Sequence, residues 1–138
     1  MSPAVGVVDT ASVMAWVRRY EDAWRAGDLA AVEGLFTEEA HYRPSPYDDS
    51  EVGHDAIKAF WRDDEGATFE VQAEPVAVQD RTAVVRVVVR YLEPRTQEYT
   101  DLWVVRFATD GRAEDFEEWA YWPGRPYSAG AEAAEHDD

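Results

Sequence analysis

Hydrophobic and polar residues follow two different periods along the chain. Before Gly66, apolar residues recur at spacings of three and four, as Val13, Trp16, Val17 and Tyr20 do, and this spacing predicts helices. After Gly66 they alternate with polar residues, which predicts strands. Helices followed by a run of strands predict an α+β domain, with three N-terminal helices packed on a curved antiparallel sheet.

The predicted elements begin and end at residues with clear conformational preferences. Asp9 or Thr10 can cap the first helix, and Gly27 can end it in a left-handed conformation. A second helix is expected over residues 29–36, and a third is expected around Ile57 and Trp61. Strands are expected at about 40–43, 67–78, 82–92, 97–107 and 112–122, with turns at 79–81, 93–96 and 108–111.

The length of 138 residues fits one domain, which we place at residues 10–127. Residues 1–9 are expected to be a flexible lead-in. Residues 128–138 are acidic and show no apolar periodicity, so we expect a disordered tail.

Charge and composition exclude several classes of function. The net charge of −16 argues against nucleic acid and anionic membrane as partners, since both require a basic surface. The absence of cysteine excludes thiol chemistry and thiolate metal sites. His41 and His54 lack metal-ligand spacing, so neither a metal site nor a cofactor is expected. Without a secretory signal or an apolar membrane span, a cytoplasmic location is expected.

The first half of the chain resembles a known family. The segments YEDAWRAGDLAAVEGLF, AHYRPSP and GHDAIKAFW are similar in order and spacing to the ketosteroid isomerase and SnoaL-like proteins of the nuclear-transport-factor-two-like superfamily. The likeness covers roughly residues 10–122. It implies a cone-shaped fold with one deep pocket, but the fold hosts many activities and does not name one.

The resemblance also shows which isomerase groups this chain lacks. Tyr20 matches the phenol that stabilises the oxyanion in the isomerase. The position of the carboxylate base is occupied by Pro44, and that of the protonated carboxylic acid by Trp103. Steroid isomerisation by the family mechanism is therefore not expected, and Tyr20 on its own fits core packing as well as catalysis.

A different charged cluster is expected on the pocket face. If Trp103 points inward, alternation sends Asp101 inward too, and four-residue turns would bring Arg86, Arg90 and Glu118 beside it. Burial and repulsion between two carboxylates raise a carboxyl pKa, which suits acid/base catalysis. The residues expected on the same face are Val88, Tyr99, Val105, Phe107, Glu114, Phe116, Ala120 and Trp122.

Two interpretations of this cluster stay open. A carboxylate–arginine–carboxylate set resembles the epoxide hydrolase branch of the superfamily, although that branch carries arginine where this chain has Tyr99. On this view Asp101, Glu118, Arg86, Arg90 and Tyr20 are catalytic, in a hydrolase or an isomerase/cyclase acting on a hydrophobic small molecule. Alternatively, the charges form a structural ion-pair network in a non-catalytic binding or accessory domain.

The remaining expectations concern the ligand and the partner copy. Seven aromatic residues are candidates to line the pocket: Trp24, Tyr42, Phe60, Trp61, Tyr99, Trp103 and Phe116. An outward apolar patch predicts a homodimer through the outer sheet face, with Arg106 pairing with Asp115 or Glu117 near its rim. The patch residues are Val85, Val87, Val89, Leu102, Val104, Trp119 and Tyr121.

Overall fold

A computed structural model of the chain describes residues 8–62, 68–93 and 96–123. The long helix α1 (Thr10–Ala26) begins and ends as the sequence predicts. The side chain of Asp9 accepts a hydrogen bond from the backbone N–H of Ser12 at 2.8 Å. Gly27 adopts a φ of 68°, where a side chain would be strained, and its N–H closes the last turn.

The segment between α1 and the main sheet is more broken than the sequence suggests. A 3₁₀ turn, η1 (Leu29–Ala31), leads into the short helix α2 (Val32–Leu35). Strand β1 (Phe36–Arg43) follows at once, so it begins earlier than expected. Strand β2 (Glu51–Val52) was not expected from the sequence, and it pairs with β1 before helix α3 (His54–Trp61) begins.

Four long strands complete the sheet, namely β3 (Thr68–Gln79), β4 (Thr82–Glu93), β5 (Gln97–Phe107) and β6 (Ala113–Tyr121). The strand order is β2-β1-β6-β5-β4-β3. Strand β1 runs parallel to β6, while the other pairs are antiparallel, so the sheet is mixed and the expected purely antiparallel sheet is wrong. No hairpin joins β1 to β6, and only hairpin connections force neighbouring strands to be antiparallel.

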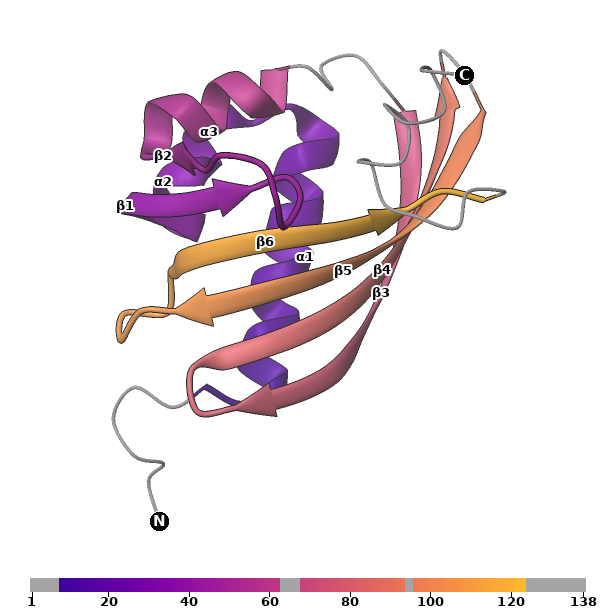
Figure 1. Ribbon diagram of the computed structural model, residues 1–138. Coiled ribbons are helices and arrows are strands. Elements are labelled where there is room, and N and C mark those ends of the chain that lie inside the picture. The colour runs from indigo at the N-terminus through magenta and orange to yellow at the C-terminus, as the bar shows by residue number, and fades with distance from the viewer. Residues whose placement is uncertain (1–7, 63–67, 94–95, 124–138) are drawn as a thin grey trace.

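The sheet is curved, and helix α1 crosses its inner side (Figure 1). Trp16 lies at the centre of the core, with its ring centroid 5.4–6.5 Å from those of Phe36, Trp103, Phe107 and Phe116. Its indole N–H donates to the carbonyl of Leu35 at 2.9 Å, which satisfies the only polar atom of the side chain. The fold is therefore α+β, with the helices packed on one face of a mixed six-stranded sheet.

The orientation predicted for β4 is wrong by one residue. Tyr91 pairs with Gln97 and Val87 pairs with Asp101, whereas a four-residue turn at 93–96 would have placed Val88 opposite Asp101. A shift of one residue turns every side chain of a strand to the other face. The three valines Val85, Val87 and Val89, predicted on the outer face, are therefore completely buried on the inner face.

Strand β6 is shifted by two residues, which preserves the face of most of its side chains. Asp101 pairs with Ala120, and Glu118 pairs with Trp103, because the register breaks between Arg106 and Phe107. The same irregularity turns Glu114 away from the core. Within the chain, Glu114 contacts the guanidinium of Arg106 at 3.2 Å. The pairing of Arg106 with Asp115 or Glu117 was expected at the rim of a dimer and stays a prediction.

Three boundary observations complete the fold. The backbone N–H of Val8 donates to the carbonyl of Asp80 at 2.8 Å, so the end of the predicted lead-in is tied to the turn between β3 and β4. The predicted acidic tail at 128–138 lies outside the described residues. Within the described ranges, no helix is both long enough and apolar enough to cross a membrane.

Candidate functional site

Two carboxyl groups meet on the inner face of neighbouring strands. Asp101 on β5 is only 1% exposed, and its Oδ2 accepts a hydrogen bond from the indole N–H of Trp103 at 3.0 Å. Its other oxygen, Oδ1, has no protein donor within hydrogen-bonding distance. Glu118 on β6 pairs across the strands with Trp103, which brings its carboxyl group beside that of Asp101.

Burial raises the pKa of the Asp101 carboxyl well above its ordinary value. The negative charge of Glu118 and a hydrogen bond between the two carboxyl groups raise this pKa further. The N–H donors of Trp103 and Trp119 oppose the shift, but their effect is smaller. The sequence-based prediction that Asp101 and Glu118 lie close together, with a raised pKa for one of them, is confirmed.

A proton on the Asp101 carboxyl group explains why its Oδ1 has no hydrogen-bond donor nearby. Two carboxylates in contact repel, and neither can supply a proton to the other while both are ionised. A protonated Asp101 can donate to Glu118, which then carries the single negative charge of the pair. The pair is best described as Asp101–H beside a Glu118 carboxylate.

A chain of phenol groups continues from Glu118. The hydroxyl of Tyr42 donates to Oε2 of Glu118 at 2.8 Å, and the hydroxyl of Tyr20 lies 3.0 Å from that of Tyr42. Tyr42 has one hydroxyl hydrogen, which goes to the carboxylate, so Tyr20 must donate to Tyr42. Burial and the charge of Glu118 raise the pKa of Tyr42 well above its ordinary value, which keeps this phenol protonated.

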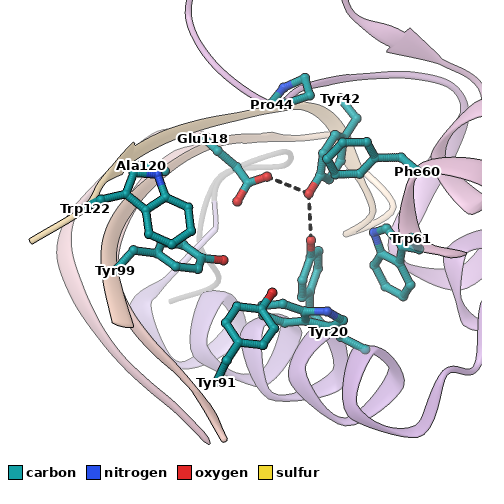
Figure 2. A pocket seen from close by; sticks show the side chains of 11 residues that line it. Tyr20, Tyr42, Pro44, Phe60, Trp61, Tyr91, Tyr99, Glu118, Ala120 and Trp122 are labelled. Carbon is teal, nitrogen blue, oxygen red and sulfur yellow. Dashed lines mark hydrogen bonds between the residues drawn. The ribbon is translucent and has the colours of Figure 1, made fainter. Parts of the chain in front are cut away.

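The phenol chain and Glu118 border a cavity of about 260 Å³ between α1, α3 and the sheet. Figure 2 shows Tyr99 and Trp122 on one side of this space and Phe60 and Trp61 on the other, with the carboxylate of Glu118 between them. The volume lies just below the range of about 300–1,000 Å³ that is usual for ligand pockets. The lining residues are Tyr20, Trp24, Tyr42, Pro44, Phe60, Trp61, Tyr91, Tyr99, Glu118, Ala120 and Trp122.

Five of the seven predicted aromatic residues line the cavity, namely Trp24, Tyr42, Phe60, Trp61 and Tyr99. Trp103 and Phe116 lie deeper, where their rings pack at 5.1 Å from each other and make up the core under the site. Trp103 still serves the site, because its N–H holds Asp101 in place.

Arg86 and Arg90 lie outside the site, which corrects the orientation predicted for them. Both side chains are more than half exposed on the outer face, where Arg86 contacts Glu74 at 3.9 Å and Arg90 contacts Glu98 at 2.9 Å. The burial of alternate valines in β4 sets this orientation. Neither guanidinium can therefore neutralise the carboxyl pair.

Sequence reasoning missed Pro44 and Tyr91 as lining residues. Pro44 was considered only as the residue that replaces the isomerase base, although that match already placed it at the pocket. Tyr91 was missed because the β4 register was wrong; in the observed register it stacks 6.2 Å from Tyr99 on the inner face. Ala120 and Trp122 were expected on this face and are found lining the cavity.

The indole N–H of Trp61 is a further unused polar group at the cavity wall. Its nitrogen is buried and has no acceptor within hydrogen-bonding distance. A buried donor without a partner destabilises a protein by about 1–3 kcal/mol. Retention of such a donor at a cavity wall fits a ligand or a water that accepts from it.

Among the described residues, no group of three or more histidine, cysteine, aspartate or glutamate side chains is placed to hold a metal ion. The site therefore offers carboxyl and phenol groups as its reactive chemistry. The positions taken over by Pro44 and Trp103 carry no carboxyl group, so the isomerase arrangement of base and acid is not reproduced.

Two solved structures share the fold of this chain. One is an epoxide hydrolase from M. tuberculosis described as LEH-like, with a TM-score of 0.67 and 15% identity over 81% of this chain and 84% of its own. The other is SalBIII, an epoxide hydrolase/cyclase-like enzyme described for pyran ring formation in the polyether salinomycin, with a TM-score of 0.67 and 19% identity over 84% of this chain and 94% of its own. These identities establish the fold alone.

A comparison with curated proteins finds no match. A comparison with family models does find one: the SnoaL-like domain matches residues 17–116. This range runs from the middle of α1 to the middle of β6, so it includes Asp101 and ends two residues before Glu118. The chain belongs to the SnoaL-like family, as the order of its helical segments indicates.

Proposed function

We propose that this protein is a cofactor-independent acid/base enzyme that acts on a small molecule in the cavity bordered by Glu118. The observation that carries the proposal is a pair of adjacent carboxyl groups, the buried Asp101 and the part-buried Glu118, of which Glu118 lines an aromatic cavity. Strongly shifted carboxyl groups at a pocket are typical of functional sites. A hydrolase or an isomerase/cyclase reaction fits this chemistry.

Glu118 is the catalytic base in this proposal. It lines the cavity, carries the charge of the pair and is held by Tyr42 at 2.8 Å. It can take a proton from a bound substrate or from a water molecule beside it. Asp101 does not line the cavity, so it is a positioning residue that donates a hydrogen bond to Glu118 and holds its charge.

The two structural neighbours support a reaction class without naming the substrate. One is described as an epoxide hydrolase and the other as an epoxide hydrolase/cyclase-like enzyme, and opening an epoxide requires proton transfer at an oxygen. The present site differs from the arrangement expected from the sequence, because Arg86 and Arg90 point away from it.

The test is turnover of a panel of small epoxides, with diol or cyclic ether products measured by mass spectrometry. Glu118→Gln should reduce the rate by about 10²-fold or more, as expected for loss of a general base. Glu117→Gln is the matched control, because Glu117 is the preceding residue of β6 and bonds to Arg43 on the outer face. Turnover unchanged in Glu118→Gln would contradict the proposed base.

A non-catalytic binding domain is the second candidate. It is favoured by one observation: the protons of Tyr42 and Tyr20 are both committed to the network around Glu118, as a structural network would require. Native mass spectrometry of the purified protein separates the two candidates when combined with the epoxide panel. A retained small molecule without any turnover in the panel would favour binding alone.

A further inference from the structure

Trp61 differs from Trp16 and Trp103 in what its indole N–H contacts. The N–H of Trp16 donates to the carbonyl of Leu35 at 2.9 Å, and that of Trp103 donates to Asp101 at 3.0 Å. In the described part of the chain, Trp61 carries the only buried side-chain donor that has no acceptor within hydrogen-bonding distance. The residue is 7% exposed, so bulk water does not satisfy this donor either.

Packing holds the Trp61 ring in one place at the cavity wall. Trp61 is the last residue of α3, and its ring centroid lies 4.9 Å from that of Tyr20 and 6.5 Å from that of Phe36. Figure 2 shows its nitrogen on the edge of the ring that is turned toward the phenols of Tyr20 and Tyr42, across the cavity from Tyr99. A donor held by packing is already oriented for a ligand, so binding costs little further ordering.

The surroundings of this donor favour a neutral oxygen atom over a charged one. Eight of the eleven residues that line the cavity are aromatic. Moving a charged group from water into such a site costs far more free energy than moving a neutral oxygen. One N–H group is enough for a carbonyl or ether oxygen, whereas a buried carboxylate requires several donors or a cation. A neutral acceptor would also remove the cost of leaving the buried donor unsatisfied.

We propose that Trp61 binds the substrate by donating its indole N–H to a neutral oxygen atom, that of a ketone, ester, ether or epoxide on a small apolar body. This inference names the substrate class of the proposed enzyme and rests on that function. Glu118 lines the same cavity, so a molecule whose oxygen lies at Trp61 can present a nearby C–H group or a water molecule to the proposed base. The N–H also stabilises negative charge that develops on this oxygen during the reaction.

Two probes of nearly the same shape test this hydrogen bond. Acetophenone carries a carbonyl oxygen where 2-phenylpropene carries a CH₂ group. The full chain has six tryptophans, so a spectrum of the ¹⁵N-labelled protein should show six indole N–H signals, and the signal missing in Trp61→Phe belongs to Trp61.

We expect acetophenone to move the Trp61 signal farther downfield than 2-phenylpropene does. The ring currents of the two probes are nearly the same, and only the ketone accepts a hydrogen bond. Nuclear Overhauser effects between each probe and the methyl group of Ala120, which lines the cavity, show that the probe lies inside.

Binding constants measure how much the hydrogen bond contributes. Trp61→Phe removes the N–H and keeps an aromatic ring on the wall, so the change in ring size affects both probes alike. The ratio of acetophenone affinity to 2-phenylpropene affinity should fall about tenfold in this variant. Trp119→Phe is the matched control, because its N–H donates to Glu117 on the outer face, and it should change the ratio by less than about twofold. Circular dichroism and a thermal melt check that each variant is folded.

Three results would overturn the inference. The first is a Trp61 signal that responds equally to both probes, because the donor would then be satisfied in another way, such as by the face of a neighbouring ring. The second is an affinity ratio unchanged in Trp61→Phe, and the third is failure of acetophenone to enter the cavity. If Trp61→Phe does not fold, through-bond experiments assign the Trp61 signal in the wild-type protein, and the comparison of the two probes still decides.

These results are independent of the test of the proposed function. Neither probe has to be turned over, so failure of the acid/base proposal appears only in the epoxide panel. Failure of the Trp61 inference appears only in the comparison of the two probes.

Discussion

On the outer face of the sheet, each arginine of β4 and β5 stands beside a carboxylate, whereas on the inner face two carboxyl groups stand beside each other. Outside, Arg90 contacts Glu98 at 2.9 Å and Arg106 contacts Glu114 at 3.2 Å, and all four side chains are more than a third exposed. Inside, the buried Asp101 accepts from Trp103, and the part-buried Glu118 beside it accepts from Tyr42.

The two faces differ in what explains their charged residues. Stability or solubility can explain the outer pairs, whereas the inner pair requires another explanation. Exposed ion pairs contribute about 0–1 kcal/mol each and tolerate change. A buried like-charged pair opposes folding unless one member takes up a proton. The inner pair is therefore the part of the sheet whose residues folding stability does not explain.

The largest expected effect on the free energy of unfolding tests which side chains of β4 lie on the inner face. Val87→Asn places an amide in the core and should lower the free energy of unfolding by about 3 kcal/mol or more. The neighbouring Val88→Asn, on the outer face, should change it by less than about 1 kcal/mol. Urea denaturation at neutral pH measures both. Equal losses would mean that the register with Val87 opposite Asp101 is wrong.

The next largest expected effect is on the free energy of association through the outer face of the sheet. We propose that two copies pair through the apolar strip of Val88, Leu102, Val104, Trp119 and Tyr121, of which Trp119 is 37% and Tyr121 41% exposed. Val104→Glu should weaken the dimer by about 1.5–3 kcal/mol, the amount gained by burying one aliphatic side chain.

Sedimentation equilibrium at several salt concentrations measures this dimer. The wild-type protein should associate more tightly as salt rises, because salt screens repulsion between two chains that each carry a net charge of −16. Val87→Glu would not test the dimer, since Val87 is buried within the chain. A monomer at micromolar concentration in about 0.15 M salt would refute the proposal.

Removing the donor of Glu118 should have an effect of comparable size on the free energy of unfolding. Tyr42→Phe deletes a hydrogen bond to a charged group, which is worth about 1.5–3 kcal/mol in the free energy of unfolding. Tyr20→Phe deletes a bond between two neutral groups, worth about 0.5–1.5 kcal/mol. Tyr121→Phe on the outer face is the control. A larger loss for Tyr20→Phe than for Tyr42→Phe would argue against Glu118 as the ionised partner.

The pH dependence of stability gives the smallest but most specific effect. Burial and Glu118 raise the pKa of Asp101 in the folded state, so the folded protein holds a proton that the unfolded chain releases near pH 4. The stability from this group is present below that pH and is lost as pH rises toward the raised pKa. Asp101→Asn should abolish this loss and stabilise the protein by about 1–2 kcal/mol at pH 8.

Unfolding by urea between pH 4 and pH 8 checks the sign. The stability of the wild-type protein relative to Asp101→Asn should fall as pH rises. Glu98→Gln, at the exposed pair with Arg90, is the control and should show no such trend. A constant difference between wild type and Asp101→Asn across this range would show that Asp101 is not protonated in the folded state.

Local signals placed the helices and most of the strands. Capping at Asp9 and the left-handed Gly27 set the bounds of α1, because both act over one turn of chain. Strand β2 was missed because its two residues carry no alternation of their own; pairing with β1 creates it. The inward orientation of Asp101 and Glu118 followed from alternation within β5 and β6.

The sequence by itself determined the family, the α+β arrangement of helices and strands, and the closeness of Asp101 to Glu118. Each depends on short-range patterns, such as the helical segment order and the two-residue period of a strand. Only the tertiary structure decided which side chains of β4 lie on the inner face. A register shift of one residue exchanges the three valines with Arg86, Val88 and Arg90. Burial of the valines determines that they are the set on the inner face. That choice places Arg86 and Arg90 on the face away from the carboxyl pair, because the free energy gained by burying apolar side chains exceeds what a buried ion pair would return.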